Sequence, residues 1–104
     1  MYLLKRRLRA RLGRLKFRKS VSHIDSLGCS IEELKIYLES LFYGNMNWNN
    51  YGKIWEIDHK EPLVKANSKS ELITLCHYSN LKPLLIQDHI VKSLEDLRKR
   101  KYVY

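Results

Sequence analysis

The sequence predicts a small α+β domain, and three observations support this fold class. The chain has 104 residues, an ordinary length for one domain. Apolar residues recur every three or four positions in several segments, which is typical of amphipathic helices. Between those segments, 54–59 alternates its residues with period two, which is typical of a strand. We therefore expect one domain over 1–104 that combines helices with a few short strands.

The N-terminal segment from residue 3 to about residue 19 predicts a basic helix. Leu4, Leu8, Leu12 and Leu15 have helical spacing, and Gly13 is a weak point in the pattern. A helix laid against nucleic-acid phosphates is the favoured interpretation, and a solvated surface helix is the alternative. The candidate phosphate-contacting residues are Arg6, Arg7, Arg9, Arg11, Arg14 and Lys16.

A second, amphipathic helix is expected after Ser30. Ser30 and Glu33 have the spacing of a capping box, in which each side chain bonds to the other residue's backbone N–H. The apolar positions that follow share one helical face and are expected to pack in the core: Ile31, Leu34, Tyr37, Leu38, Leu41 and Phe42.

The rest of the chain alternates loops with short elements. The segment 44–52 is rich in Asn and Gly and predicts a loop that leads into the strand. Pro62 is expected to end regular structure soon after that strand. A second capping-box pattern from Ser68 to Glu71 predicts a short helix. An extended segment is expected at 80–84, and helical spacing from about Gln87 predicts a final helix.

The charge of the chain favours a polyanionic partner. With 20 Lys and Arg against 11 Asp and Glu, the formal net charge is +9. Nucleic acid is therefore the expected partner, and an anionic membrane surface is the weaker alternative. No apolar run approaches the roughly 20 residues that span a bilayer, and no signal-peptide core is present. We expect a cytoplasmic protein without membrane association.

Four residues at the ends of these elements form a candidate hydrolytic site. Asp58 and His59 end the strand, Asn80 begins the extended segment and His89 opens the last helix. Asp58 and His89 are candidate ligands of a divalent cation, because they leave positions open for water and a phosphate oxygen. His59, on the other side of the strand, is the candidate general base, and Asn80 is expected to orient its imidazole. Lys92, one helical turn after His89, is a candidate phosphate contact.

Other residues near this site have structural interpretations. His77 is expected to be part of a hydrogen-bonded connection, and His23 lies in a polar stretch and is expected to be exposed. Trp55 is expected in the core. Glu56 shares a strand face with Asp58, which makes it conceivable as a third metal ligand.

These residues, in this order, resemble the His-Asn-His (HNH) endonucleases. The matching segments are WEIDH (55–59) with Pro62, HYSNLKPL (77–84) and DHIVKS (88–93). A block found ahead of that motif in phage and bacterial members is similar to LGCS (27–30), LESLF (38–42) and NWNNYG (47–52). The resemblance implies a ββα-metal (His-Me finger) core of a short hairpin and one helix, preceded by the basic and amphipathic helices. It implies a basic DNA-contacting extension at 1–26, a catalytic core at 27–97 and a basic tail at 98–104.

The resemblance also implies the chemistry. His59 would be the general base, Asn80 its orienting partner, and Asp58 and His89 the ligands of one divalent ion. That ion would be Mg²⁺ or Mn²⁺, with Ni²⁺ or Zn²⁺ as alternatives. The substrate would be DNA, cut by phosphodiester hydrolysis as a nick or a double-strand break, in the host cytoplasm if the chain is phage-encoded. An ordinary histidine pKa of about 6.5 predicts that activity falls below that pH.

Two other functions stay open on the sequence. A non-catalytic basic nucleic-acid-binding protein would use the same elements to bind phosphates, with structural histidines. A structural zinc protein would use His77, His89 and the two cysteines, but Cys29 and Cys76 lack the spacing of a zinc knuckle or a disulfide framework. A nuclease of this size would act as a monomer or homodimer, with low specificity or with specificity supplied by a partner protein.

Overall fold

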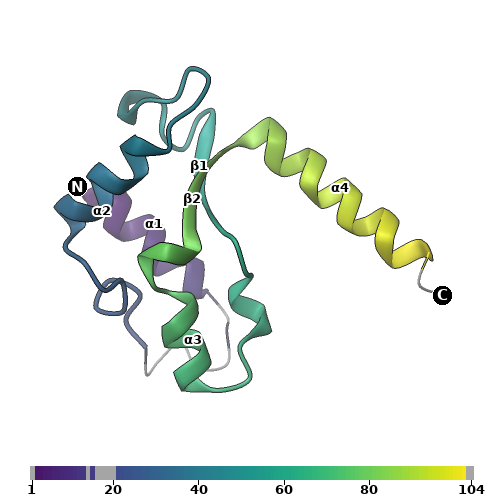
Figure 1. Cartoon of the computed structure of the whole chain (residues 1–104), viewed down its shortest axis with the longest axis horizontal. Helices are drawn as coiled ribbons and strands as arrows, with labels where there is room; N and C mark the ends of the chain where they lie inside the picture. The colour runs from purple at the N-terminus through teal and green to yellow at the C-terminus, as the bar shows by residue number, and fades with distance from the viewer. Residues whose placement is uncertain (1, 14, 16–20, 103–104) are drawn as a thin grey trace.

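Helices and a small sheet make up the protein, as the predicted α+β class requires (Figure 1). A computed structural model describes residues 2–13, 15 and 21–102. Within them the order of elements is α1 (Tyr2–Leu12), α2 (Ile31–Ser40), β1 (Trp55–His59), α3 (Lys69–Leu75), β2 (Leu81–Leu85) and α4 (Ile86–Tyr102). Short 3₁₀ turns occur at Trp48–Asn50, Leu63–Lys65 and Tyr78–Asn80. No helix in this described part is long and apolar enough to cross a membrane.

The sheet consists of β1 and β2, which pair antiparallel. The register runs from Trp55 opposite Leu85 to His59 opposite Leu81. Trp55, Ile57 and His59 are buried, whereas the alternating residues of β1 are half-buried. The predicted period-two strand is therefore confirmed, and its buried face ends on the imidazole of His59.

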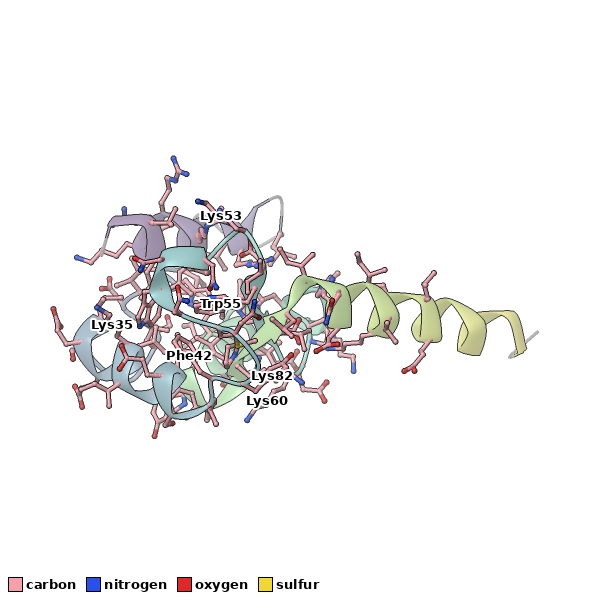
Figure 2. All side chains as sticks on the ribbon, turned by 90° about the horizontal axis from the view of Figure 1, so that it is seen from above. Lys35, Phe42, Lys53, Trp55, Lys60 and Lys82 are labelled. Carbon is pink, nitrogen blue, oxygen red and sulfur yellow. The ribbon has the colours of Figure 1, made fainter. Side chains whose placement is uncertain are left out.

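Aromatic side chains fill the core between α2 and the sheet. Trp55 is fully buried, as predicted, and its ring centroid lies 5.0 Å from that of Phe42 and 4.5 Å from that of Tyr51. Trp48 closes the cluster at 5.3 Å from Trp55. Figure 2 shows Phe42 and Trp55 inside the body of the protein, with α4 extending away from it. This cluster anchors the start of β1 and thereby fixes the direction in which the strand carries Asp58 and His59.

The basic helix α1 belongs to the core more than the sequence predicted. Leu4 and Leu8 are buried in the main apolar cluster of the core. Leu12 is buried in a second apolar cluster. The helix ends at Leu12, and the next residue, Gly13, has a φ of +44°, a left-handed conformation that glycine adopts readily. α1 is thus an amphipathic helix whose leucine stripe is buried in the core. It is not fully solvated, and its attachment to the protein does not depend on nucleic-acid phosphates.

Both predicted capping patterns occur, one of them in modified form. Ser30 Oγ accepts from the backbone N–H of Glu33 at 3.0 Å, and Glu33 Oε1 accepts from the N–H of Ser30 at 3.1 Å. Ser68 Oγ accepts from Glu71 N at 3.1 Å, but the Glu71 carboxylate accepts from Asn67 N at 2.6 Å, one residue earlier than in a capping box. The helix starts at Ile31 and Lys69 follow from these bonds.

The last helix follows β2 without a loop. α4 begins at Ile86, one residue before the predicted start. Tyr43 holds the junction, because its hydroxyl accepts from Leu85 N at 3.0 Å and donates to Asp88 Oδ2 at 2.7 Å. Only the first turns of α4 lie near the sheet, and the rest of the helix projects from the body (Figure 1). The direction of that first turn decides where His89 and Lys92 lie.

Candidate functional site

The end of β1 places Asp58 and His59 on opposite faces of the strand. His59 belongs to the buried face, with 9 % of its surface exposed. The Asp58 carboxylate lies on the other face, where Oδ2 accepts a hydrogen bond from Lys92 Nζ at 3.0 Å. This ion pair links the end of β1 to α4.

A surface hollow gathers most of the predicted site residues. It has a volume of about 360 Å³ and is lined by the ends of α1, β1 and α4, with Arg11, Asp58, His59, His89 and Lys92 among its lining residues. A second hollow of about 420 Å³ shares two of these residues, Arg11 and His89. Residues far apart in the sequence therefore surround one opening, as the proposed hydrolytic site requires.

His59 has an unusual partner in this hollow. Its Nε2 lies 3.0 Å from Nε2 of His23, and the two ring centroids are 5.2 Å apart. Burial, the His23 ring and the Arg11 guanidinium lower the pKa of His59 to about 4, although the Asp58 carboxylate raises it in part. The expectation of an ordinary pKa near 6.5 is therefore wrong, and His59 is neutral throughout the mildly acidic range.

The prediction that His23 is exposed is also wrong, since only 1 % of its surface is exposed. Val21 and Leu27, on either side of it, are buried in separate apolar clusters. A backbone hydrogen bond from Ser26 N to Ser22 O at 3.0 Å closes the turn between them. The sequence signal was the apolar spacing on both sides of the histidine, which the polar residues of the segment obscured.

Asn80 acts on the backbone and not on the imidazole. Its Oδ1 accepts from Glu61 N at 2.8 Å, and its Nδ2 donates to Glu61 O at 3.0 Å and to Leu75 O at 2.8 Å. Its own carbonyl accepts from Lys60 N at 2.8 Å. Both hydrogens of the Asn80 amide are thus donated to backbone carbonyls. The expected direct hydrogen bond from Asn80 to His59 is not formed; Asn80 instead holds the backbone just after His59 in place.

The expected metal ligands Asp58 and His89 line the same hollow from different elements. Asp58 is at the end of β1, and His89 is exposed on the first turn of α4. Among the described residues, no group of three or more His, Cys, Asp or Glu side chains could hold a metal ion. A carboxylate and an imidazole suit Mg²⁺, Mn²⁺ or a later transition metal that completes its coordination with water and phosphate. The ammonium of Lys92 is paired with Asp58, so a positive charge already lies at this carboxylate.

Glu56, the conceivable third ligand, is engaged elsewhere. Arg7 Nη1 lies 2.7 Å from its Oε1, and Arg11 Nη2 lies 3.1 Å from its Oε2. Arg11 also donates to the carbonyl of Ile57 at 3.0 Å. Two of the predicted phosphate-binding arginines therefore fasten α1 to β1.

The remaining predicted phosphate contacts differ in their positions. Arg6 and Arg9 lie on the exposed side of α1. Arg14 and Lys16 lie outside the described residues.

His77 has the structural role that the sequence predicted. Its Nδ1 lies 2.8 Å from Ser79 Oγ and accepts from Ser79 N at 3.2 Å. Its ring packs against Gly28, where an added Cβ would lie 2.5 Å from Nε2. His77 and the free cysteines Cys29 and Cys76 form no ligand cluster in the described part of the chain.

Comparisons with known proteins add one relative. No protein-family model matches the chain, and no solved structure matches it. An uncharacterized protein, L426, of Acanthamoeba polyphaga mimivirus is 32 % identical over 87 residues, which are 80 % of this chain. The chain spans 38 % of the length of that relative.

Proposed function

We propose that this protein is a metal-dependent DNA endonuclease of the HNH type, with β1, β2 and α4 as its ββα-metal core. The observation that carries the proposal is the shared hollow, in which Asp58 and His59 from β1 meet His89 and Lys92 from α4. An acid, an imidazole base, a second imidazole and an ammonium are the groups that phosphodiester hydrolysis needs.

His59 is the proposed general base. It lines the hollow, and its lowered pKa keeps the ring neutral at physiological pH, so a nitrogen lone pair is present to take a proton. A water molecule gives its proton to the imidazole while its oxygen forms the new bond to phosphorus. The bond from phosphorus to the leaving sugar oxygen breaks, and that oxygen takes a proton from solvent.

Asp58 and His89 are the residues that would hold a divalent cation, Mg²⁺ or Mn²⁺ first and Ni²⁺ or Zn²⁺ as alternatives. When bound, such an ion supplies positive charge that stabilises the negative charge on the phosphate and on the leaving oxygen. Lys92 lies beside Asp58 and would turn its ammonium to the phosphate once the carboxylate has another cation.

DNA is the proposed substrate because the walls of the hollow and the chain as a whole are basic. The formal net charge is +9, and Arg11 and Lys92 line the hollow itself. Arg9 on the exposed side of α1 extends this positive surface. Such a surface attracts the phosphate backbone regardless of sequence and gives binding that weakens steeply with salt.

A non-catalytic nucleic-acid-binding protein is the second candidate. The observation that favours it is the ion pair of Asp58 with Lys92, which neutralises the carboxylate without a metal ion. In that case the hollow would bind phosphate through its basic residues, and divalent cations would not be needed.

Incubation with supercoiled plasmid at low salt separates the two candidates. Purified protein is mixed with the plasmid in Mg²⁺, Mn²⁺ or EDTA and the topological forms are resolved on a gel. The nuclease converts plasmid to open-circular or linear DNA only with a divalent cation. Retarded plasmid without conversion in any metal supports the binding protein and contradicts the nuclease.

A further inference from the structure

A single hydroxyl group joins the end of β2 to the first turn of α4. Tyr43, in the segment that follows α2, accepts from the backbone N–H of Leu85 at 3.0 Å and donates to Asp88 Oδ2 at 2.7 Å. Leu85 is the last residue before α4, and Asp88 is the third residue of that helix. The N–H, the hydroxyl and the carboxylate therefore form a relay across the junction.

This relay stands where a capping box would be expected. In α2 the third helical residue is Glu33, whose carboxylate accepts at 3.1 Å directly from the N–H of Ser30, the residue before that helix. The same position in α4 is occupied by Asp88, whose side chain is one methylene shorter. The Tyr43 hydroxyl lies between the carboxylate and the N–H of Leu85, and it ties the start of α4 to another part of the chain.

Polar contacts at its first turn are important for the direction of α4, because apolar packing contributes little. Ile90, Val91 and Leu94 are each more than half exposed. Beyond its first turns the helix projects from the body of the protein (Figure 1). An apolar helix face that stays in water gains little free energy from burial. The direction of α4 therefore depends on the bonds near its start.

Two other bonds of the described residues hold α4, and each leaves its direction open. Ile86 N donates to Ile54 O at 2.8 Å, which anchors only the first residue of the helix. Lys92 Nζ lies 3.0 Å from Asp58 Oδ2, but 43 % of the Lys92 side chain is exposed, so this ion pair is weak. A divalent ion at Asp58 would also displace the ammonium. The contact of Tyr43 with the first turn would then remain.

We propose that Tyr43 is a positioning residue for the candidate metal site, where it fixes His89 on α4 relative to Asp58 on β1. This inference rests on the proposed function, because that function requires the two side chains to share one ion. His89 follows Asp88 directly, so a change in the direction of the first turn moves its imidazole. A ligand that is not held in place has to be ordered when the ion binds, which weakens binding.

Residual dipolar couplings test the structural part of the proposal without metal or DNA. In ¹⁵N-labelled protein, the couplings of backbone amides report the direction of α4 relative to the sheet. We expect one fixed direction in the wild type and averaged, smaller couplings for α4 in Tyr43→Phe, which removes only the hydroxyl. Tyr37→Phe is the matched control, because the Tyr37 hydroxyl donates to Leu81 O at 3.3 Å, at the other end of β2. Unchanged α4 couplings in Tyr43→Phe would overturn the proposal.

Asp88→Glu supplies a rescue that a purely packing role of Tyr43 would not show. When Tyr43→Phe and Asp88→Glu are combined, the longer carboxylate can accept directly from Leu85 N–H, as Glu33 does from Ser30 in α2. We expect this double variant to recover most of the wild-type couplings in α4. A double variant with couplings as small as those of Tyr43→Phe would overturn the relay.

Calorimetric titration with Mn²⁺ in the absence of DNA tests the consequence for the metal site. Tyr43→Phe should weaken binding about 5-fold or more, and the double variant should restore it. Tyr37→Phe should bind Mn²⁺ as the wild type does. Each protein is titrated well below its thermal unfolding transition, so a loss of affinity does not reflect a loss of folding. Equal Mn²⁺ affinities of Tyr43→Phe and the wild type would overturn the positioning role.

The outcomes distinguish this proposal from the proposed function. If the wild type binds Mn²⁺ and cleaves DNA while Tyr43→Phe keeps both the helix direction and the affinity, the nuclease stands and the positioning role is overturned. If the wild type binds no Mn²⁺ and cleaves no DNA in any metal, the nuclease proposal fails and the role of Tyr43 at a metal site fails with it.

Discussion

The Lys92 ammonium lies 3.0 Å from Asp58 Oδ2, so a cation from α4 is bound to the carboxylate at the end of β1. The pair is partly sheltered, with 13 % of the Asp58 side chain exposed and 43 % of the Lys92 side chain. A divalent ion at Asp58 has to displace this ammonium, whereas a phosphate would draw the ammonium away. In the proposed nuclease, this ion pair would therefore connect metal binding to substrate binding.

Replacing Lys92 should strengthen metal binding. Lys92→Met removes the competing charge from Asp58, and we expect the affinity for Mn²⁺ to rise about 3-fold to 10-fold, measured by calorimetry without DNA. Lys82→Met is the matched control, because Lys82 lies opposite Asp58 in the strand register and the exchange removes the same charge. Equal Mn²⁺ affinities of the two variants would show that Lys92 does not compete.

Glu56→Gln should increase DNA affinity. Glu56 forms ion pairs with both Arg7 and Arg11, so its loss frees two guanidinium groups beside the hollow. We expect a 3-fold to 10-fold tighter complex at low salt and a steeper salt dependence, measured by fluorescence anisotropy. The free energy of unfolding should fall by less than about 1 kcal/mol, because the pairs are partly exposed. Glu32→Gln changes the same charge on α2; if it tightens binding equally, net charge alone is responsible.

Asn80→Ala should destabilise the protein and slow cleavage. The change leaves the backbone groups of Glu61 and Leu75 without their side-chain partner. We expect a loss of about 1–3 kcal/mol in the free energy of unfolding, measured by urea denaturation. Asn49→Ala, in the exposed turn before β1, should cost less than about 0.5 kcal/mol. A loss no larger than that of the control would contradict the role of Asn80 as a clamp.

Acid should destabilise the fold before the carboxylates titrate. In the unfolded chain His59 binds a proton below about pH 6.5, but in the folded protein its pKa is about 4. The unfolded state therefore binds more protons between these values, and stability falls as the pH drops through this window, by up to about 3 kcal/mol from this residue.

Denaturation at several pH values measures this effect. His59→Gln should flatten the slope between pH 6.5 and 4. An unchanged slope in His59→Gln would contradict the lowered pKa. The same lowered pKa predicts that cleavage by the wild type persists at pH 5.5, where an ordinary histidine would be mostly protonated.

Local patterns predicted the elements well, because each depends on residues close in sequence. The capping bonds of Ser30 and the alternation that ends at His59 needed no tertiary information. The place of α1 in the core depended on what its leucine stripe packs against, which the pattern of one helix does not contain. For the same reason Arg7 and Arg11 were assigned to phosphate, although Glu56 lies within reach only in the folded chain.

The sequence predicted which residues line the hollow better than it predicted the hydrogen-bond partners of those residues. Asp58, His59, His89 and Lys92 do line one hollow, because β1 and the start of α4 fix them. The partner of His59 was missed, since a turn 36 residues earlier supplies it. Asn80 was predicted beside the ring but bonds to backbone, because such bonds depend on where the chain returns after α3.

The most direct test of the account measures DNA binding and cleavage in parallel for Asp58→Asn, His59→Ala and His89→Ala. A labelled duplex is used at low salt, with Mn²⁺ or Mg²⁺ for cleavage and without metal for affinity. The account predicts that His59→Ala and His89→Ala bind DNA within about 3-fold of the wild type, that Asp58→Asn binds at least as tightly because it frees Lys92, and that His59→Ala cleaves at least about 100-fold more slowly. Cleavage by His59→Ala at the wild-type rate, or a wild type that binds and never cleaves in any metal, would contradict it.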